Sequence, residues 1–156
     1  MIHIGLDKET REKSIGCLQV LLADEYVLYV KTQKFHWNVT GPFLGSLHKL
    51  FNDHYEELAE FNDAIAERVR ALGAMSIGTL KEFLEQSSLQ ENPGVNPSYD
   101  QMIAELVADH EKVIQKMRTY AEDTQEWEDM GTNNFLLNLL EKHEKMAWML
   151  RAHLEK

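Results

Sequence analysis

Hydrophobic residues recur at helical spacing along most of this 156-residue chain. The recurrence predicts four long amphipathic helices: 8–38 (with Thr10 as an alternative start), about 42–72, one that opens at Ser98, and about 132–154. A shorter amphipathic stretch, Thr79 to Leu89, lies between the second and third of them. The pattern therefore indicates an all-α protein with four long helices and one short helix.

Residues suited to helix ends stand at the expected boundaries. Asp7 precedes the first helix and Thr79 precedes the short one, and both residue types are good N-caps. Pro42 suits the first turn of the second helix, and Gly73 suits its end. Glycine and proline punctuate residues 73–98, a segment too long for a tight turn. We expect this segment to carry the chain from the second long helix to the third.

The first helix is apolar on more than one side. Ile15, Leu18 and Leu22 follow one stripe, but Leu21 and Leu28 widen the apolar face beyond that stripe. A helix of this kind is covered by neighbours on several sides. We expect it to pack both inside a bundle and at a subunit contact.

Candidate metal ligands lie along the second helix and just before it. Histidine and carboxylate are ligand types that iron accepts, and Asp63 and Glu67 lie one turn apart on one helical face. His48 lies fifteen residues before Asp63, roughly 22 Å away at 1.5 Å rise per residue. His36 lies before the Gly41–Pro42 break, where a turn can return it toward His48. The imidazoles and carboxylates can share an ion only if a second copy of the helix runs antiparallel alongside, so the spacing predicts a site between subunits.

The remaining histidines are interpreted as structural. His54 lies about 240° around the helix from His48, and we expect it on the surface. His110 and His143 follow apolar stripes, and we expect each to be satisfied by a carbonyl or carboxylate in the core. No histidine has a glutamate three residues before it, so the Glu-x-x-His pattern of an in-bundle di-iron site is not encoded. Asp24 and Glu25 are interpreted as rim salt-bridge residues.

The charge balance favours cationic partners over nucleic acid. Asp+Glu number 26 against 16 Lys+Arg, a formal net charge of −10, and no basic run interrupts this field. Direct binding to duplex DNA is therefore not expected, whereas cations are attracted. An acidic cluster near the start of the last helix is a candidate for guiding cations, although a solvated helix end explains it equally well: Glu122, Asp123, Glu126, Glu128 and Asp129.

Cys17 is the single cysteine, so no intrachain disulfide is possible and a reducing compartment is favoured. It lies in an apolar run, and we expect a small buried side chain rather than a nucleophile. The first residues lack the pattern of a signal peptide, and no apolar run is long enough to span a membrane. We therefore expect a cytoplasmic protein with no membrane association.

Three segments closely resemble the Dps family of ferritin-like mini-ferritins, and the resemblance extends over nearly the whole chain. They are Lys34-Phe35-His36-Trp37-Asn38-Val39-Thr40-Gly41-Pro42, Leu47-His48-Lys49 and Asp63-Ala64-Ile65-Ala66-Glu67-Arg68. The resemblance implies one ferritin-like domain over residues 1–156 and a homo-oligomer, a dodecameric shell of four-helix bundles, with the short helix at a two-fold contact. It further implies a ferroxidase that oxidises Fe(II), preferentially with hydrogen peroxide rather than dioxygen, and stores the ferric mineral.

The resemblance also implies individual roles. His36, His48, Asp63 and Glu67 correspond to the ferroxidase ligands of the family. Trp37 corresponds to an oxidisable ring near the iron, although its type and position also suit an aromatic anchor between helices.

Departures from the family pattern keep two alternatives open. Asn52 and Asn134 stand where acidic residues are common, near a second iron position and a pore, respectively. DNA-binding members carry lysine-rich tails, whereas the charges of residues 1–13 sum to zero. The alternatives to a ferroxidase are a nucleoid-associated protein that protects DNA by direct binding and an inert helical bundle used for assembly.

Overall fold

The computed structural model describes residues 2–155, so the two end residues of the predicted domain lie outside it. Five helices and no strand are present in this range, which confirms the all-α prediction. The helices are α1 (Lys8–Asn38), α2 (Leu44–Leu72), α3 (Leu80–Gln86), α4 (Tyr99–Glu126) and α5 (Met130–Ala152).

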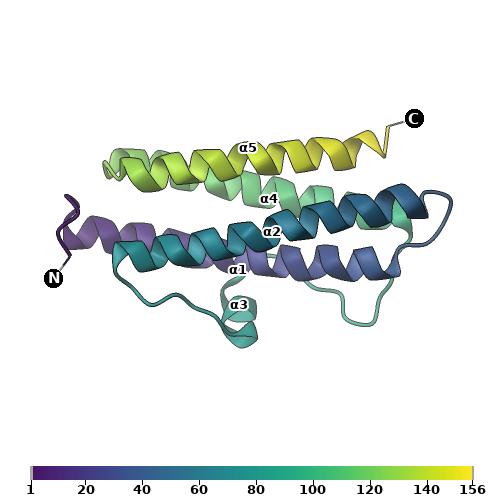
Figure 1. Ribbon diagram of the computed structural model, residues 1–156, viewed down its shortest axis with the longest axis horizontal. Helices are drawn as coiled ribbons and strands as arrows, with labels where there is room; N and C mark the ends of the chain where they lie inside the picture. Colours follow the sequence, from purple (N-terminus) through teal and green to yellow (C-terminus); the bar gives the residue numbers. More distant parts are fainter. Residues whose placement is uncertain (1, 156) are drawn as a thin grey trace.

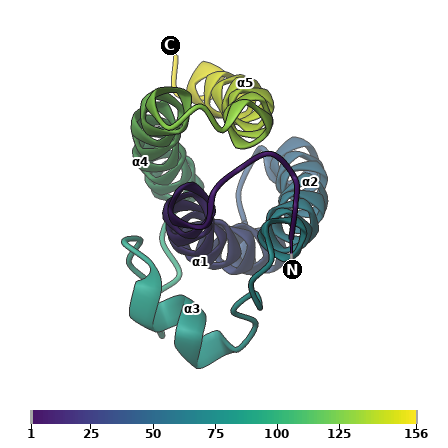
Figure 2. The ribbon, with the colours of Figure 1, turned by 90° about the vertical axis from the view of Figure 1, so that its left-hand side faces the viewer.

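The four long helices form a bundle with one long crossover (Figure 1). Helices α1 and α2 make one antiparallel hairpin, and α4 and α5 make the other. Residues 73–98 run back along the bundle, so α4 starts at the same end as α2 and the ring of Tyr99 packs against Phe43. Viewed end-on, α3 lies outside the ring of four helices, against α1 (Figure 2). This arrangement is that of ferritin-like bundles.

The core is built from leucine, isoleucine, valine, phenylalanine and methionine side chains of all four long helices. Leu18, Leu58, Leu106 and Leu150 represent α1, α2, α4 and α5, respectively, and all four are fully buried. Each such side chain contributes about 1.5 to 3 kcal/mol through its removal from water. This packing fixes α2, a single helix from Leu44 to Leu72, within the bundle, and with it the positions of the candidate ligands.

Turns and hydrogen bonds at the helix ends explain where the boundaries differ from the predicted ones. Residues 41–43 form a turn, so α2 begins at Leu44 rather than at Pro42. Helix α5 begins at Met130, two residues earlier than predicted, because the Asp129 carboxylate caps it by accepting from Thr132 N. Helix α3 ends at Gln86 because the next two residues, Ser87 and Ser88, donate hydrogen bonds to Asp24 instead of continuing the helix.

Asp24 anchors the crossover to the bundle. Its side chain is 1% exposed and accepts hydrogen bonds from Ser87 Oγ and Ser88 N, and Lys116 forms an ion pair with it. The predicted rim position of Asp24 and Glu25 is therefore wrong, because both side chains are buried, although Asp24 does form the predicted salt bridge. Their position on α1 faces α4 and α5 rather than solvent.

Asp129 does not belong with the exposed acidic residues. It is 1% exposed and bonded to Ser14, Arg68 and Thr132, which join α1, α2 and α5. Its assignment to a cation-guiding cluster is therefore wrong. Glu122, Glu126 and Glu128 are exposed, as that prediction requires, and Asp123 is half-buried.

His54 is buried, only 3% exposed, so its predicted surface position is wrong. The face of α2 that carries His48, Asp63 and Glu67 is the exposed one. A residue on the opposite side of that helix therefore points into the bundle, next to His110.

Cys17 is half-buried, and burial raises the pKa of its thiol to about 11. This agrees with the expectation that Cys17 is not a nucleophile, because the thiolate is the reactive form. None of the helices in the described part of the chain combines the length and apolar character that a membrane crossing requires.

Candidate metal centre

A tight turn at one end of the bundle brings two histidines together. Gly41 adopts φ +106°, a conformation that favours glycine, and a Cβ there would lie 3.1 Å from Cδ1 of Tyr99. The chain therefore reverses closely, and His36 at the end of α1 meets His48 in the second turn of α2. The structure confirms the predicted return of His36 toward His48.

The two histidines hold each other in a reciprocal pair. His36 Nδ1 lies 2.7 Å from the carbonyl oxygen of His48, and His48 Nδ1 lies 2.8 Å from the carbonyl oxygen of His36. The rings stack with centres 3.8 Å apart and planes 17° from parallel. Because a carbonyl only accepts, each Nδ1 carries a proton, and in the neutral imidazole the Nε2 keeps its lone pair. Both imidazoles are thereby fixed in the tautomer that ligates metal through Nε2.

Tyr55 packs against this pair. Its ring meets the ring of His36 edge-on at 5.3 Å, and its hydroxyl donates to Asn52 Oδ1 at 3.0 Å. The sequence interpretation missed Tyr55, although its position seven residues after His48 places it on the same face of α2. Asn52 is thus engaged as a hydrogen-bond acceptor beside the histidines.

Asp63 and Glu67 lie on the same exposed face of α2, near its far end. Within residues 2–155, neither carboxylate takes part in a hydrogen bond or an ion pair, so both retain their full acceptor capacity. Helix α2 is continuous from Leu44 to Leu72, which keeps His48 and Asp63 roughly 22 Å apart. No group of three or more metal-binding side chains is assembled in the described chain alone.

A groove of about 360 Å³ runs beside Asp63, between α1, α2 and α3. Its walls are mainly aromatic and aliphatic, with Tyr26, Tyr29 and Phe83 among them. The carboxylate therefore lies at the edge of an apolar surface, the setting that a helix of another subunit requires for packing.

Trp37 follows His36 and is 66% exposed. An indole ring this exposed is not anchored within its own chain. The position suits either contact with a neighbouring subunit or reaction near a bound metal.

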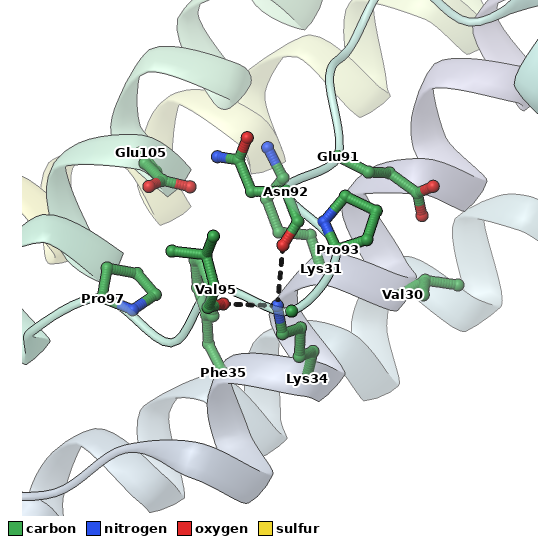
Figure 3. A pocket seen from close by; sticks show the side chains of 11 residues that line it. Val30, Lys31, Lys34, Phe35, Glu91, Asn92, Pro93, Val95, Pro97 and Glu105 are labelled. Carbon is green, nitrogen blue, oxygen red and sulfur yellow. Dashed lines mark hydrogen bonds between the residues drawn. The ribbon is translucent and has the colours of Figure 1, made fainter.

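A second cavity, of about 350 Å³, lies between α1 and the crossover (Figure 3). Lys34 Nζ donates to the carbonyl oxygens of Asn92 and Val95, as the dashed lines show. Lys31, on the same wall, pairs with Asp109 at 2.6 Å. Lys34 therefore ties α1 to the crossover and Lys31 ties α1 to α4, so both lysines have structural partners, and we place the metal chemistry at the histidine pair.

The bundle, its single long crossover and the donors on α2 define a ferritin-like protein, and the ferritin-like domain profile matches residues 15–156. A protein of Nostoc sp. named as an uncharacterised low temperature-induced protein is 48% identical over 155 residues, 99% of this chain and 87% of the relative. DNA protection during starvation protein 2 of Bacillus anthracis is 38% identical over 140 residues, 90% of this chain and 95% of that protein.

Among solved structures, the Dps protein of Vibrio cholerae superimposes with a TM-score of 0.94 at 28% identity. The match covers 99% of this chain and 97% of that one, which is described as a member of a broad superfamily of ferritin-like diiron-carboxylate proteins. The chain belongs to the Dps family of ferritin-like proteins.

Proposed function

We propose that this protein oxidises Fe(II), with hydrogen peroxide preferred over dioxygen, and stores the ferric product inside a shell of identical subunits. The observation that carries the proposal is the reciprocal His36–His48 pair, which frees both Nε2 atoms at one end of an exposed helix face. The free carboxylates of Asp63 and Glu67 lie on the same face near its other end. Membership in the ferritin-like family supports the same conclusion.

Each donor has a distinct part in this chemistry. The imidazoles of His36 and His48 bind Fe(II) as neutral nitrogen ligands whose orientation the carbonyl bonds fix in advance. The carboxylates of Asp63 and Glu67 supply negative charge, which favours Fe(III) over Fe(II). Four protein donors leave positions on the metal open to the oxidant.

The assembly follows from the distance between His48 and the carboxylates, which is too long for one chain to place them on the same ion. A two-fold axis at the middle of α2 places His48 of one chain beside Asp63 and Glu67 of the other, twice per pair. The apolar groove beside Asp63 offers the surface for this contact. The resemblance to Dps proteins extends the pair to a dodecamer of single-domain subunits, and the single cysteine favours the cytoplasm as its compartment.

The proposal predicts that iron oxidation is lost in the His36→Ala/His48→Ala protein. Loss of an outer partner of a ligand already lowers metal affinity or activity 10- to 100-fold, so loss of two ligands lowers the initial rate at least about tenfold. Near-ultraviolet absorbance after addition of Fe(II) and peroxide measures the rate.

The matched control is His153→Ala, since His153 is exposed just after α5 and contacts neither histidine. Its rate remains that of the parent protein. An unchanged rate in the double variant, at an unchanged particle mass in solution, would falsify the proposed site.

Trp37→Phe tests the role of the exposed indole. If the ring supplies an electron when peroxide is reduced, its replacement raises hydroxyl-radical release and leaves iron uptake unchanged. Spin trapping during peroxide addition measures the release. A fall in particle mass with unchanged radical release would instead assign Trp37 to a subunit contact.

Several relatives are named for DNA protection, so direct DNA binding is the second candidate function. The charges in the first helical turns are paired here: Lys8 with Glu12 at 3.5 Å and Lys13 with Glu9 at 2.7 Å. With the net charge of −10, we expect no retarded DNA band in a low-salt gel-shift experiment. A retarded band that disappears as salt rises would contradict this expectation.

A further inference from the structure

A cluster of four ionisable side chains lies in the middle of the bundle, away from the histidine pair. Each long helix contributes one member: Glu25 from α1, His54 from α2, His110 from α4 and His143 from α5. Their exposed fractions are 0%, 3%, 0% and 0%, respectively. Buried groups of this kind are costly unless they are paired or bind a metal.

Only part of the cluster is paired. His110 Nδ1 and His143 Nδ1 are 2.9 Å apart, and His143 Nε2 lies 2.8 Å from Glu25 Oε1. His143 therefore lies between the Glu25 carboxylate and the His110 imidazole. Its contact with Glu25 has the distance of an ion pair, but neither Glu25 oxygen nor His143 Nε2 forms a hydrogen bond with any described residue. A carboxylate behind a histidine is the usual support of a metal-ligating imidazole.

The other nitrogens of the cluster lack partners. His110 Nε2 and both ring nitrogens of His54 form no hydrogen bond with any described residue. A buried polar atom left in this way costs about 1 to 3 kcal/mol. These three nitrogens are therefore available to coordinate a metal ion, either in their present positions or after rotation of the rings.

Two of the ring separations fall in the range expected for imidazoles that share one ion. With metal–nitrogen bonds of about 2.0 to 2.1 Å, two such rings have centres roughly 4.5 to 6.5 Å apart, depending on the angle at the metal. The ring centres of His110 and His143 are 5.0 Å apart, and those of His54 and His110 are 6.2 Å apart. The donor atoms do not converge on one point, so ligation of a single ion requires the rings to rotate.

The protonation state of the cluster suits ligation. Burial lowers the pKa of His54 to about 4 and lowers that of His110 well below its ordinary value. Both imidazoles are therefore neutral near pH 7, the form that binds metal. Glu25 supplies a carboxylate that offsets part of the charge of a divalent ion.

We propose that His54, His110 and His143 bind one divalent ion of the zinc class inside each subunit, with Glu25 positioning His143. Zinc suits imidazole ligands and a site closed to solvent. The site would tie α2, α4 and α5 together, and α1 through Glu25. This proposal does not depend on iron oxidation, because the cluster shares no residue with the proposed ferroxidase ligands His36, His48, Asp63 and Glu67.

Cobalt loading tests the proposal in the His36→Ala/His48→Ala protein, where the site between subunits lacks its imidazoles. The full chain is refolded with Co²⁺, since the cluster is closed to solvent in the folded state, and is then freed of loose metal by chelation and gel filtration. We expect about one retained Co²⁺ per chain, with the visible bands of a low-coordinate nitrogen site. Addition of His143→Phe lowers retention at least about tenfold, whereas addition of His153→Ala does not change it.

Anomalous scattering covers the case in which the His143→Phe chain fails to fold. Crystals of the wild-type protein refolded with Zn²⁺ give a peak at the zinc edge between His110 and His143. Metal found only between subunits, or cobalt retention that is equal with and without His143, overturns the proposal.

Discussion

Two inactive variants regain iron oxidation when their chains are assembled together. One variant is His36→Ala/His48→Ala, which lacks the imidazoles, and the other is Asp63→Asn/Glu67→Gln, which lacks the carboxylates. As homo-oligomers, both lose at least about tenfold in initial rate, because every site lacks two ligands. Co-refolding the two chains in equal amounts restores a measurable fraction of the wild-type rate.

The size of the recovery follows from two-fold symmetry. In a mixed pair, one site combines the two mutated halves and is inactive, whereas the other combines the intact histidines of one chain with the intact carboxylates of its partner. Random mixing makes half of the pairs mixed, so about one quarter of the wild-type sites return. This gain is large against two inactive parents.

One control and one alternative outcome distinguish a site shared between subunits from a site within one chain. Mixing the folded variants without refolding leaves the rate low unless the chains exchange, which mass spectrometry of the intact particles detects. If a complete site lay within one chain, co-refolding would give only the mean of the two parents. That outcome would rule out a site shared between subunits.

The helix positions could be predicted from the sequence because the apolar period and the caps agree. The Asp7 and Thr79 caps stand where they were expected, and Gly73 ends α2 in the left-handed conformation, with φ +103°. The boundaries of α2 and α5 shifted because of the local turn and cap, whereas that of α3 shifted because of a distant partner. Asp24 of α1 binds the residues that follow α3 and so ends that helix early. The position of Asp24 depends on α1 and on Lys116 of α4, not on the sequence around α3.

The positions of the candidate ligands along the chain were predictable, but the tautomer of the two histidines was not. Spacing along α2 separates His48 from Asp63 whatever the tertiary structure, because a helix has a fixed rise. The stacked, reciprocal bonding of His36 and His48 depends on the geometry of the turn at Gly41. No periodicity in the sequence encodes it.

Of the buried cluster, His110 and His143 were correctly expected in the core, but His54 and Glu25 were not. His54 was assigned to the surface on the assumption that the face opposite the ligands is solvated, but α2 turns its ligand face outward. Glu25 was assigned to a rim because its neighbours on α1 do not reveal that His143, 118 residues later, lies against it. Whether such a residue is buried depends on packing against helices far away in the sequence. The sequence pattern of one helix does not carry this information.

The junction at Asp129 gives the largest expected effect on stability. Its carboxylate accepts from Thr132 N at 3.0 Å and from Ser14 Oγ at 2.7 Å, and it lies 3.3 Å from Arg68 Nη2. Burial raises the pKa of this carboxyl. The hydrogen bonds from Thr132 and Ser14 and the charge of Arg68 outweigh that effect, so the pKa lies below its ordinary value of 3.8. The stabilisation is therefore complete above that value and is lost as the pH falls below it.

Replacement of Asp129 by alanine lowers the free energy of unfolding by about 2 to 4 kcal/mol, because it removes a buried carboxylate that accepts from Ser14 and Thr132 and pairs with the partly exposed Arg68. The N-cap of α5 is lost in the same step. Urea unfolding at pH 7 and a fixed protein concentration measures the change. Asp129→Asn loses less, since asparagine still caps a helix, and Asp53→Ala, which breaks an exposed pair with Lys49, leaves the unfolding free energy almost unchanged. Equal effects for Asp129→Ala and Asp53→Ala would show that the three-helix junction carries no more stability than a surface ion pair.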